Sequence, residues 1–387
     1  MIIHTVQGME CPYDIAAKYS VPVTKLLSDN GKGERLCEGE ELIVIMPTKT
    51  AVVRGGDTLH SFAARYGVKE SAVIAANPEL ATDKRLRPGR ILAVKQHNLG
   101  LGAATAVGIT DCGTENAHLE RALPYLTYVI IRALEVTEDG IRAVRDARGA
   151  VARCTAEGKP VLLGVTDTTG GAFLGNHDTI TEALPDICRK MGACGICLIA
   201  NEGAICRPKE YCSFVLAVRK RFIGCELMLF TALTEGAPAD AAELADGAVF
   251  ITSGTSRGAD RAAMERLSAI AESSKIFVDL PSRIRMGDGD ACPAEISELC
   301  RKGGYPLTRT DELFIKAECR LYKRGRREQI SVCFPSLEYI KAKLVSLAEL
   351  GFAGVFIDID KLDIRYLTMF NAAFRRADYE LKERYIF

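Results

Sequence analysis

The fold of this chain is decided by the stretch Gly192-Ala193-Cys194-Gly195-Ile196-Cys197-Leu198-Ile199-Ala200-Asn201-Glu202. Its short apolar run is bounded by glycine and follows a helix-like segment over Thr179–Met191, a pattern typical of a buried strand. Similar runs alternate with helical segments after residue 104. They predict eight strands, at Thr105–Ile109, Thr127–Ala133, Pro160–Val165, Gly195–Ala200, Glu226–Ala232, Gly247–Thr252, Lys275–Leu280 and Gly354–Ile359. This alternation predicts an α/β fold with a (β/α)8 barrel, and an open doubly wound sheet is the alternative. The interval Pro281–Leu350 is expected to hold a β-rich insertion and the last helix.

Length and charge indicate a chain of several domains. Its 387 residues exceed one ordinary domain and suit a barrel preceded by small modules. Lysine plus arginine and aspartate plus glutamate each number 50, so the net charge gives no electrostatic footprint for nucleic acid or an anionic membrane. Hydrophobic residues make up 48%, yet no apolar run approaches membrane-spanning length.

The N-terminus and the cysteines bear on the compartment. Residues 1–6 lack the basic and apolar regions of a secretory signal peptide, so we expect synthesis in the cytoplasm. The 14 cysteines are then expected to be reduced, and most of them to be small buried apolar residues. Later cross-linking in an extracellular shell remains open.

An internal repeat occupies the N-terminal quarter of the chain. Its matching segments are Ile15-Ala16-Ala17-Lys18-Tyr19 with Phe62-Ala63-Ala64-Arg65-Tyr66, Asn30 with Asn77, and Gly39-Glu40-Glu41-Leu42 with Gly89-Arg90-Ile91-Leu92. Each unit is expected to run strand, helix, helix, strand. The predicted domains are therefore two βααβ modules at 1–47 and 48–96, a hinge at 97–103 and the barrel at 104–387.

Both repeat units resemble LysM modules, which bind N-acetylglucosamine-containing polymers such as peptidoglycan and chitin. The second unit keeps the usual Gly56-Asp57-Thr58-Leu59 and Asn77-Pro78, whereas the first reads Met9-Glu10-Cys11-Pro12 at the first of these positions. The resemblance implies glycan contacts in two loops of each module. These are Gly56, Asp57, Thr58, Leu59, Asn77, Pro78, Glu79 and Leu80 in the second module, and Met9, Glu10, Cys11, Asn30 and Gly31 in the first. The alternative is that these residues only cap helices and form turns.

The barrel resembles family-18 glycoside hydrolases, the chitinase-like enzymes. Their fourth strand reads Asp-Gly-x-Asp-x-Asp-x-Glu, and the final glutamate is the proton donor. Aligned on Gly195, the three aspartate positions fall on Cys194, Cys197 and Ile199, and the glutamate position falls on Asn201. Tandem LysM modules ahead of such a barrel resemble the cortex-lytic and coat-associated proteins of bacterial endospores.

This alignment predicts that the barrel has lost the family's chemistry. An amide carries no titratable proton, so Asn201 cannot act as a general acid. On the sixth strand, a tyrosine and an aspartate of the family fall on Ser253 and Gly254, and its sugar-stacking tryptophan falls on Asp358. We therefore expect no catalytic residue. The alternative is an active N-acetylglucosaminidase-type enzyme that uses Glu202 as a relocated acid.

Other candidate sites are weaker. Carboxylates gather at the predicted C-terminal strand ends, where barrel enzymes place their chemistry, but helix capping is the favoured explanation. They are Asp111, Glu135, Asp167, Asp279, Asp358 and Asp360. Cys194 and Cys197 have metal-site spacing, yet residues three apart on a strand should point to opposite faces. No metal and no cofactor are predicted.

The expected function is therefore binding without catalysis. The LysM tandem would anchor the protein to peptidoglycan or another N-acetylglucosamine polymer. The degenerate barrel would hold glycan or contact spore coat proteins, with no nucleic acid or membrane partner. The expected destination is the endospore cortex and coat, or the cell wall.

Overall fold

The computed structural model describes residues 1–31, 33, 35–111, 117–137, 140–167, 177–200, 206–234, 236–252, 256–287, 289–310, 313–323 and 326–376. The chain forms two compact units. The first contains Met1–Leu101, Ile284–Lys341 and Asp363–Arg375, and the second contains chiefly Gly102–Arg283 and Ala342–Leu362. Segments that the sequence analysis assigned to the barrel domain thus belong to the unit of the N-terminal modules.

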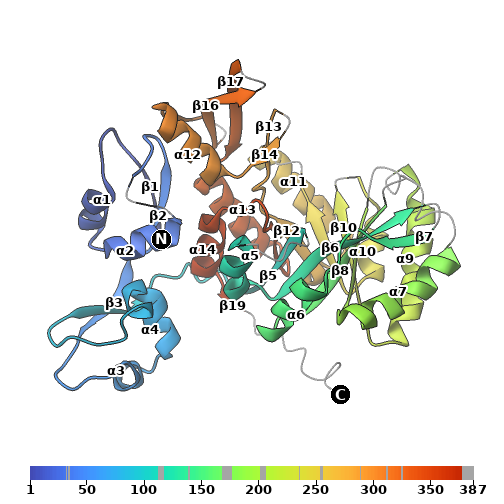
Figure 1. Cartoon of the computed structure of the whole chain (residues 1–387), viewed down its shortest axis with the longest axis horizontal. Helices are drawn as coiled ribbons and strands as arrows, with labels where there is room; N and C mark the ends of the chain where they lie inside the picture. The colour runs from blue at the N-terminus through green and yellow to red at the C-terminus, as the bar shows by residue number, and fades with distance from the viewer. Residues whose placement is uncertain are drawn as a thin grey trace. The chain divides into compact units, whose positions relative to one another are not determined.

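The second unit is a closed barrel of eight parallel strands (Figure 1). In barrel order they are β5 (Ala103–Asp111), β6 (Tyr128–Thr137), β8 (Val161–Asp167), β9 (Gly195–Ile199), β10 (Met228–Thr234), β11 (Gly247–Ile251), β12 (Ile276–Asp279) and β18 (Gly354–Asp358). Strand β5 pairs in parallel with both β6 and β18, which closes the ring. The (β/α)8 prediction is confirmed with all eight expected strands, and the open-sheet alternative is wrong.

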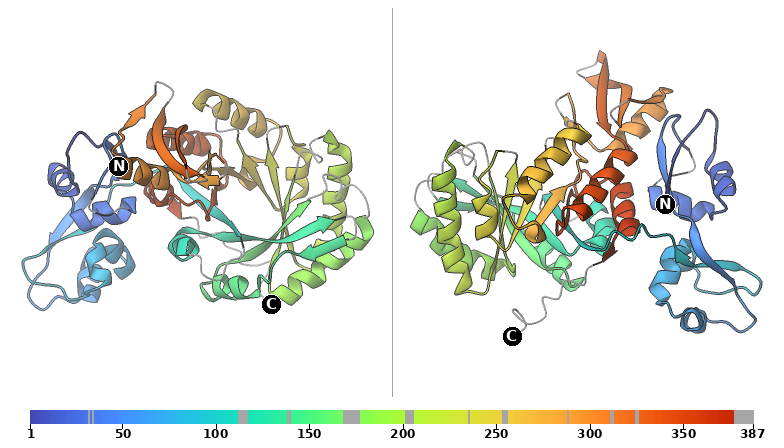
Figure 2. Two further views of the ribbon diagram at one scale, coloured as in Figure 1. Left: turned by 45° about the horizontal axis from the view of Figure 1, so that its top comes forward. Right: turned by 180° about the vertical axis from the view of Figure 1, so that it is seen from behind.

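Helices cover the outside of the strand ring (Figure 2). The helices and 3₁₀ turns of this part of the chain are α5 (Ala117–Ala122), η2 (Leu123–Tyr125), α6 (Arg148–Ala156), α7 (His177–Met191), α9 (Pro208–Ile223), α10 (Asp240–Leu244), α11 (Arg257–Ser268), η4 (Ser273–Lys275) and α13 (Leu337–Glu349). The short strand β7 (Gly140–Ala143) pairs antiparallel with the end of β6. No helix among the described residues combines the length and hydrophobicity that a membrane crossing needs.

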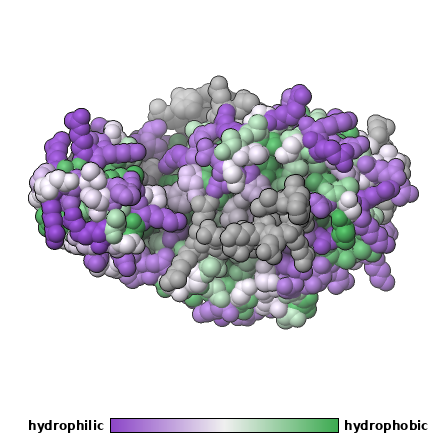
Figure 3. Space-filling model, turned by 90° about the horizontal axis from the view of Figure 1, so that it is seen from below, coloured by the Kyte–Doolittle hydropathy of each residue, from purple (hydrophilic) through white to green (hydrophobic). Residues whose placement is uncertain are grey.

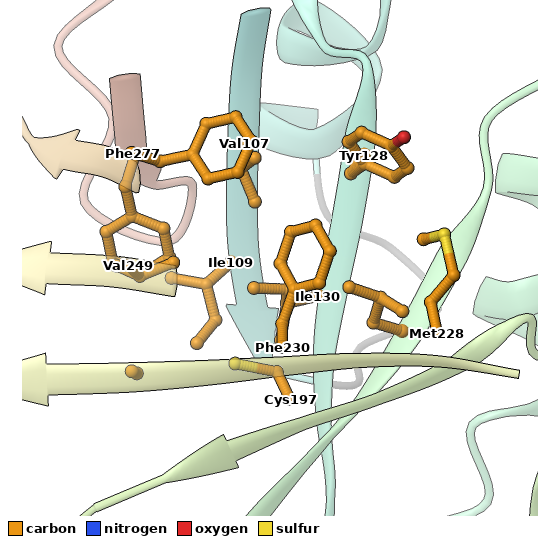
Figure 4. Packing of buried hydrophobic residues seen from close by; sticks show 12 residues of the cluster. Val107, Ile109, Tyr128, Ile130, Cys197, Met228, Phe230, Val249 and Phe277 are labelled. Atoms are coloured by element: carbon orange, nitrogen blue, oxygen red, sulfur yellow. The ribbon is translucent and has the colours of Figure 1, made fainter. Parts of the chain in front are cut away.

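Inward-facing side chains fill the barrel (Figure 4). Phe230 lies at the centre, stacked on Phe277 with ring centroids 5.7 Å apart and tilted against Tyr128 at 5.5 Å. Cys197 is fully buried in this cluster, and Ile199 packs against it. The interior of β9 is therefore apolar at the two positions where the family-18 strand carries aspartates.

The first unit begins with two βααβ modules, each with its own apolar core. The first module comprises β1 (Ile2–Thr5), α1 (Pro12–Tyr19), α2 (Val23–Asn30) and β2 (Glu41–Val44). The second comprises β3 (Pro47–Val52), α3 (Leu59–Tyr66), α4 (Glu70–Ala76), η1 (Pro78–Ala81) and β4 (Ile91–Gln96). In each module the first and last strands pair antiparallel, as the repeat predicts.

The rest of the first unit is the β-rich insertion expected after residue 281. It contains β13 (Ile284–Met286), β14 (Gly289–Ala291), α12 (Pro293–Gly303), β15 (Leu307–Arg309), β16 (Phe314–Lys323) and β17 (Arg326–Pro335), followed later by α14 (Ile364–Ala373) and β19 (Arg375–Arg376). Strands β15, β16 and β17 form an antiparallel sheet. The N–H groups of Leu99 and Leu101, within the predicted hinge, donate to the carbonyls of Ala372 and Ala373.

The described surface is largely polar on the face seen in Figure 3, where hydrophobic residues occur in small separate groups. Among the described residues, the large apolar side chains that are exposed are few and scattered along the chain, which is ordinary for a folded protein.

The backbone of β10 lies so close to Gly195 that the effect of a larger residue there can be predicted. A Cβ at this position would collide with the carbonyl oxygen of Met228 on β10, and backbone atoms in a closed barrel cannot move aside. We expect Gly195→Ala to lower the free energy of unfolding by about 3 kcal/mol or more. The control is Gly258→Ala in α11, where a Cβ meets nothing within 4 Å. This substitution should stabilise the protein by about 0.5–1 kcal/mol. Equal denaturant midpoints for the two variants would contradict this.

Candidate functional site

The first predicted wall of the glycan groove in the second module is the turn between β3 and α3. Gly56 is exposed and has a φ of +83°, the left-handed region that favours glycine. Asp57 pairs with Arg65 and accepts a hydrogen bond from the Arg54 N–H at 2.8 Å, and these hydrogen bonds, in that order, lower the pKa of its carboxyl. Thr58 is exposed and caps α3. The turn is thus internally braced and offers Gly56 and Thr58 to a ligand.

The second predicted wall begins at Asn77, whose side chain is internal. Its Nδ2 donates to the carbonyls of Val73 and Ala93 at 2.8 and 2.9 Å, and its Oδ1 accepts from the Ala93 N–H at 2.9 Å. The Asn77 amide therefore ties α4 to β4. Leu59 and Leu80 are also buried, in the module's core. These three of the eight predicted residues have side chains turned away from solvent.

Pro78 and Glu79 lie in η1 and are half-buried. The Glu79 carboxylate pairs with Arg90 at 2.5 Å and accepts a hydrogen bond from Thr24 Oγ1 at 3.1 Å. Because Thr24 begins α2 of the first module, this carboxylate joins the two modules. Its predicted role as a glycan contact stays a prediction.

The first module keeps the same loop frame in spite of its different residues. Glu10 accepts a hydrogen bond from the Gln7 N–H at 2.8 Å, as Asp57 does from Arg54 in the second module. That hydrogen bond is the main reason that the pKa of Glu10 is lowered, and His4 at 2.9 Å adds to it. Met9 beside it is fully exposed.

Asn30 repeats the role of Asn77. Its Nδ2 donates to the carbonyls of Leu26 and Ile43, both at 2.8 Å, and its Oδ1 accepts from the Ile43 N–H at 2.7 Å. Cys11 precedes α1, and Gly31 ends α2 with a φ of +59°. The asparagine that sequence reasoning assigned to glycan contact is thus a structural tie in both modules.

Two cysteines of the barrel require a correction. We expected Cys194 and Cys197 to point to opposite faces of a strand, but both pack against the barrel core. Cys194 precedes β9, so strand alternation does not apply to it, and its thiol donates to the Val161 carbonyl at 3.0 Å. Burial raises the pKa of both thiols, which makes them unreactive. Among the described residues, no group of histidine, cysteine and carboxylate side chains is placed to hold a metal ion.

The carboxyl ends of β5, β6 and β18 bring together three of the predicted rim carboxylates. Arg132 Nε contacts Asp111 Oδ1 at 2.5 Å, and its Nη2 contacts Asp360 Oδ2 at 3.1 Å. Arg283 Nε contacts Asp358 Oδ2 at 2.8 Å. Two arginines thus engage these three carboxylates, an arrangement that neither helix capping nor a metal site describes.

The remaining rim carboxylates have separate surroundings. Glu135 pairs with Arg142 at 2.6 Å, and Asp167 is buried. Asp279 belongs to a buried network in which Lys343 Nζ reaches Asp279, Asp260 and Thr252 Oγ1 at 3.1, 2.9 and 2.6 Å.

Sequence reasoning missed Lys343. The available signal was a lysine inside the apolar stripe of α13, between Ile340 and Leu344, which are both fully buried. A cation on that stripe needs buried acceptors, and Asp260 and Asp279 provide them.

The predicted acid positions Asn201 and Glu202 lie outside the described residues, as do Ser253 and Gly254. The structure therefore says nothing of their geometry. Within the described part of the mouth, Asp358, which the sequence resemblance aligns with the family-18 tryptophan, is held by Arg283.

Comparison with known proteins agrees with this architecture. Residues 51–95 match the family described as LysM domain. The whole chain is similar to the Bacillus megaterium QM B1551 spore cortex-lytic enzyme SleL, with 18% identity, TM-score 0.72 and coverage of 97% of this chain and 98% of that one. The Bacillus cereus spore cortex-lytic enzyme SleL is similar at 17% identity and TM-score 0.73, covering 97% and 99%.

A chitinase from Chromobacterium violaceum ATCC 12472 is similar at 12% identity and TM-score 0.61, covering 70% of this chain and 99% of that one. A search of curated protein sequences finds no match. The chain therefore has a chitinase-like (β/α)8 barrel fold and carries a LysM domain at residues 51–95.

The hydrogen bonds of Asn77 predict how its removal changes the stability of the second module. Asn77→Ala removes three hydrogen bonds and leaves buried backbone groups unpaired, so we expect a loss of about 2–4 kcal/mol in the stability of the second module. Asn98→Ala, at an exposed amide, should change stability by less than about 1 kcal/mol. Thermal unfolding measures both. Glycan affinity of folded Asn77→Ala protein should stay unchanged, and a selective loss of affinity would instead make Asn77 a ligand contact.

Proposed function

We propose that this protein binds an N-acetylglucosamine-containing cell-wall glycan, with peptidoglycan as the expected polymer, through its LysM region. The observation that carries the proposal is the match of residues 51–95 to the LysM domain family. The braced and exposed turn at Gly56 and Thr58 supports it, because a rigid loop loses little conformational entropy when it binds.

We further propose that the barrel does not cleave glycan and acts as a glycan-binding or scaffold domain. Cys197 and Ile199 support this, since both pack in the barrel core where the resembled family carries aspartates. The amide of Asn201 at the acid position supports it as well. In addition, three rim carboxylates are engaged by Arg132 and Arg283.

The setting that we propose is the endospore cortex and coat, or the cell wall. The similar structures from two Bacillus species are spore cortex-lytic enzymes, which supports a related location for this chain. Spore coat proteins are then the expected protein partners.

A matched pair of glycine variants tests glycan binding. Gly56 and Gly67 both have positive φ, and a Cβ at either position meets nothing within 4 Å, so asparagine should be tolerated equally at both. Only Gly56 lies in the predicted groove. We expect Gly56→Asn to weaken co-sedimentation with insoluble peptidoglycan at least about fivefold, equivalent to about 1 kcal/mol, and Gly67→Asn to leave it unchanged. Equal binding by both variants and the unaltered protein would contradict the groove assignment.

Product analysis tests the inactivity of the barrel. We expect mass spectrometry to detect no new fragments after incubation of the purified protein with muropeptides or cortex peptidoglycan. If fragments appear and Glu202→Gln abolishes them, the protein is a glycosidase with a relocated acid. If they appear and persist in that variant, the rim carboxylates become the candidates.

A further inference from the structure

The edge of the first module at residues 37–41, immediately before and at the start of β2, is buried against the chain's own insertion. Cys37 is 4% exposed and lies in the insertion's apolar cluster, and its Sγ donates to the Tyr305 carbonyl at 3.4 Å. The Leu307 N–H donates to the Glu38 carbonyl at 2.9 Å. Gly39 approaches β15 so closely that a Cβ would collide with the carbonyl oxygen of Leu307. A short strand of the insertion is thus fitted to this edge.

Charged groups complete the same contact. Arg365 of α14 is 3% exposed, and its Nη1 donates to the Glu41 carbonyl oxygen at 2.9 Å. It also pairs with Asp363 at 2.5 Å and faces Glu40 at 3.7 Å. The guanidinium thus joins both chain segments, since Glu40 and Glu41 belong to the first module and Asp363 precedes α14.

The Glu41 side chain adds contacts to the start of α13 and to the insertion. Its carboxylate accepts a hydrogen bond from the Leu337 N–H at 2.5 Å and faces Arg309 at 3.6 Å. Burial is the main reason that the pKa of Glu41 is raised, and the Leu337 N–H and the arginines oppose that effect. Charges at this depth are stable only with their partners in place, so the contact is specific.

In the second module, most of the residues that correspond to this edge are exposed and do not pack against the insertion. Gly89 corresponds to Gly39 and has a similar φ, +86° against +77°, yet a Cβ there meets nothing within 4 Å. Ile91 corresponds to Glu41 and is 66% exposed. Arg87, which corresponds to Cys37, is exposed too. The two repeats therefore share a backbone but differ at the residues that the first module uses against the insertion.

We propose that the first module is a docking module, whose edge at residues 37–41 binds the insertion and α14 of its own chain, and that glycan recognition is left to the second module. The assignment of glycan recognition rests on the proposed function, whereas the docking does not. Glu79 and Thr24 hold the second module to α2 of the first, so the docked module positions the glycan-binding one.

The repeat supplies its own control for the docking. Gly39→Ala and Gly89→Ala carry the same cost of placing alanine at positive φ, but only the first collides with β15. In hydrogen exchange on the full chain, we expect Gly39→Ala to speed exchange about tenfold or more at the amides of Leu307 and Leu337. Gly89→Ala should leave them unchanged. Equal exchange in the two variants overturns the docking.

Should Gly39→Ala fail to fold, Arg365→Met provides the same readout without a steric clash. It should also expose the Leu307 and Leu337 amides, because Glu40, Glu41 and Asp363 lose their shared cation. Protection equal to that of the unaltered protein overturns the proposal.

Peptidoglycan co-sedimentation separates the docking from the glycan assignment. Gly31→Asn in the predicted groove of the first module should bind as the unaltered protein does, whereas Gly56→Asn should bind at least about fivefold more weakly. If both substitutions weaken peptidoglycan binding equally, the division of roles between the modules is overturned, but the proposal that the protein binds glycan still stands. No weakening by either, with the docking result upheld, contradicts the proposed function alone.

Discussion

The structure depends on the closure of the barrel, in which β5 pairs with both β6 and β18. Closure removes every free strand edge, and in a ring of eight strands the interior has room for side chains and little else. Each inward position must therefore hold either an apolar group that packs or a charge that finds a partner inside the protein. This constraint decides which residues can occupy the inward positions of β9.

The two replacements on β9 follow from that constraint. Cys197 and Ile199 pack with Phe230 and its neighbours, so the barrel needs no buried charge at these positions. Where charges do remain at the mouth, they are balanced at short range, as between Arg132 and Asp360. Such pairs link the ends of neighbouring strands, and the apolar side chains below them pack the strands against one another. The apolar centre and the ion pairs at the mouth thus both stabilise the barrel.

Local periodicity was enough to predict the eight strands and the repeat, because each element carries its own apolar pattern. The tie made by Asn77 was not predictable in the same way, since a buried amide and a ligand-binding amide look alike in one sequence. Long-range contacts were also missed. Arg365 and Glu41 are separated by 324 positions, and neither segment shows a pattern that points to the other. The direction of the Cys194 side chain was predicted wrongly because β9 begins at Gly195, so Cys194 lies just outside the strand.

The repeat gives the clearest link between sequence and role. Two modules with one backbone frame diverge at Cys37 and Glu41, which correspond to Arg87 and Ile91, while the asparagine tie and the acidic brace of the turn are kept. The modules differ at this edge as well as in the first turn, and the buried contacts of residues 37–41 support a change of partner at the edge.

If glycan recognition is left to the second module, the tandem gains nothing from bivalent effective concentration on a repetitive polymer. Its affinity is then that of one module, which a hydrogen bond from Thr24 to Glu79 links to the first. What the first module contributes instead is orientation, because a docked module loses no further freedom when glycan binds its neighbour. In such an arrangement, a first module that does not bind glycan still favours glycan binding by the second module, because it orients that module.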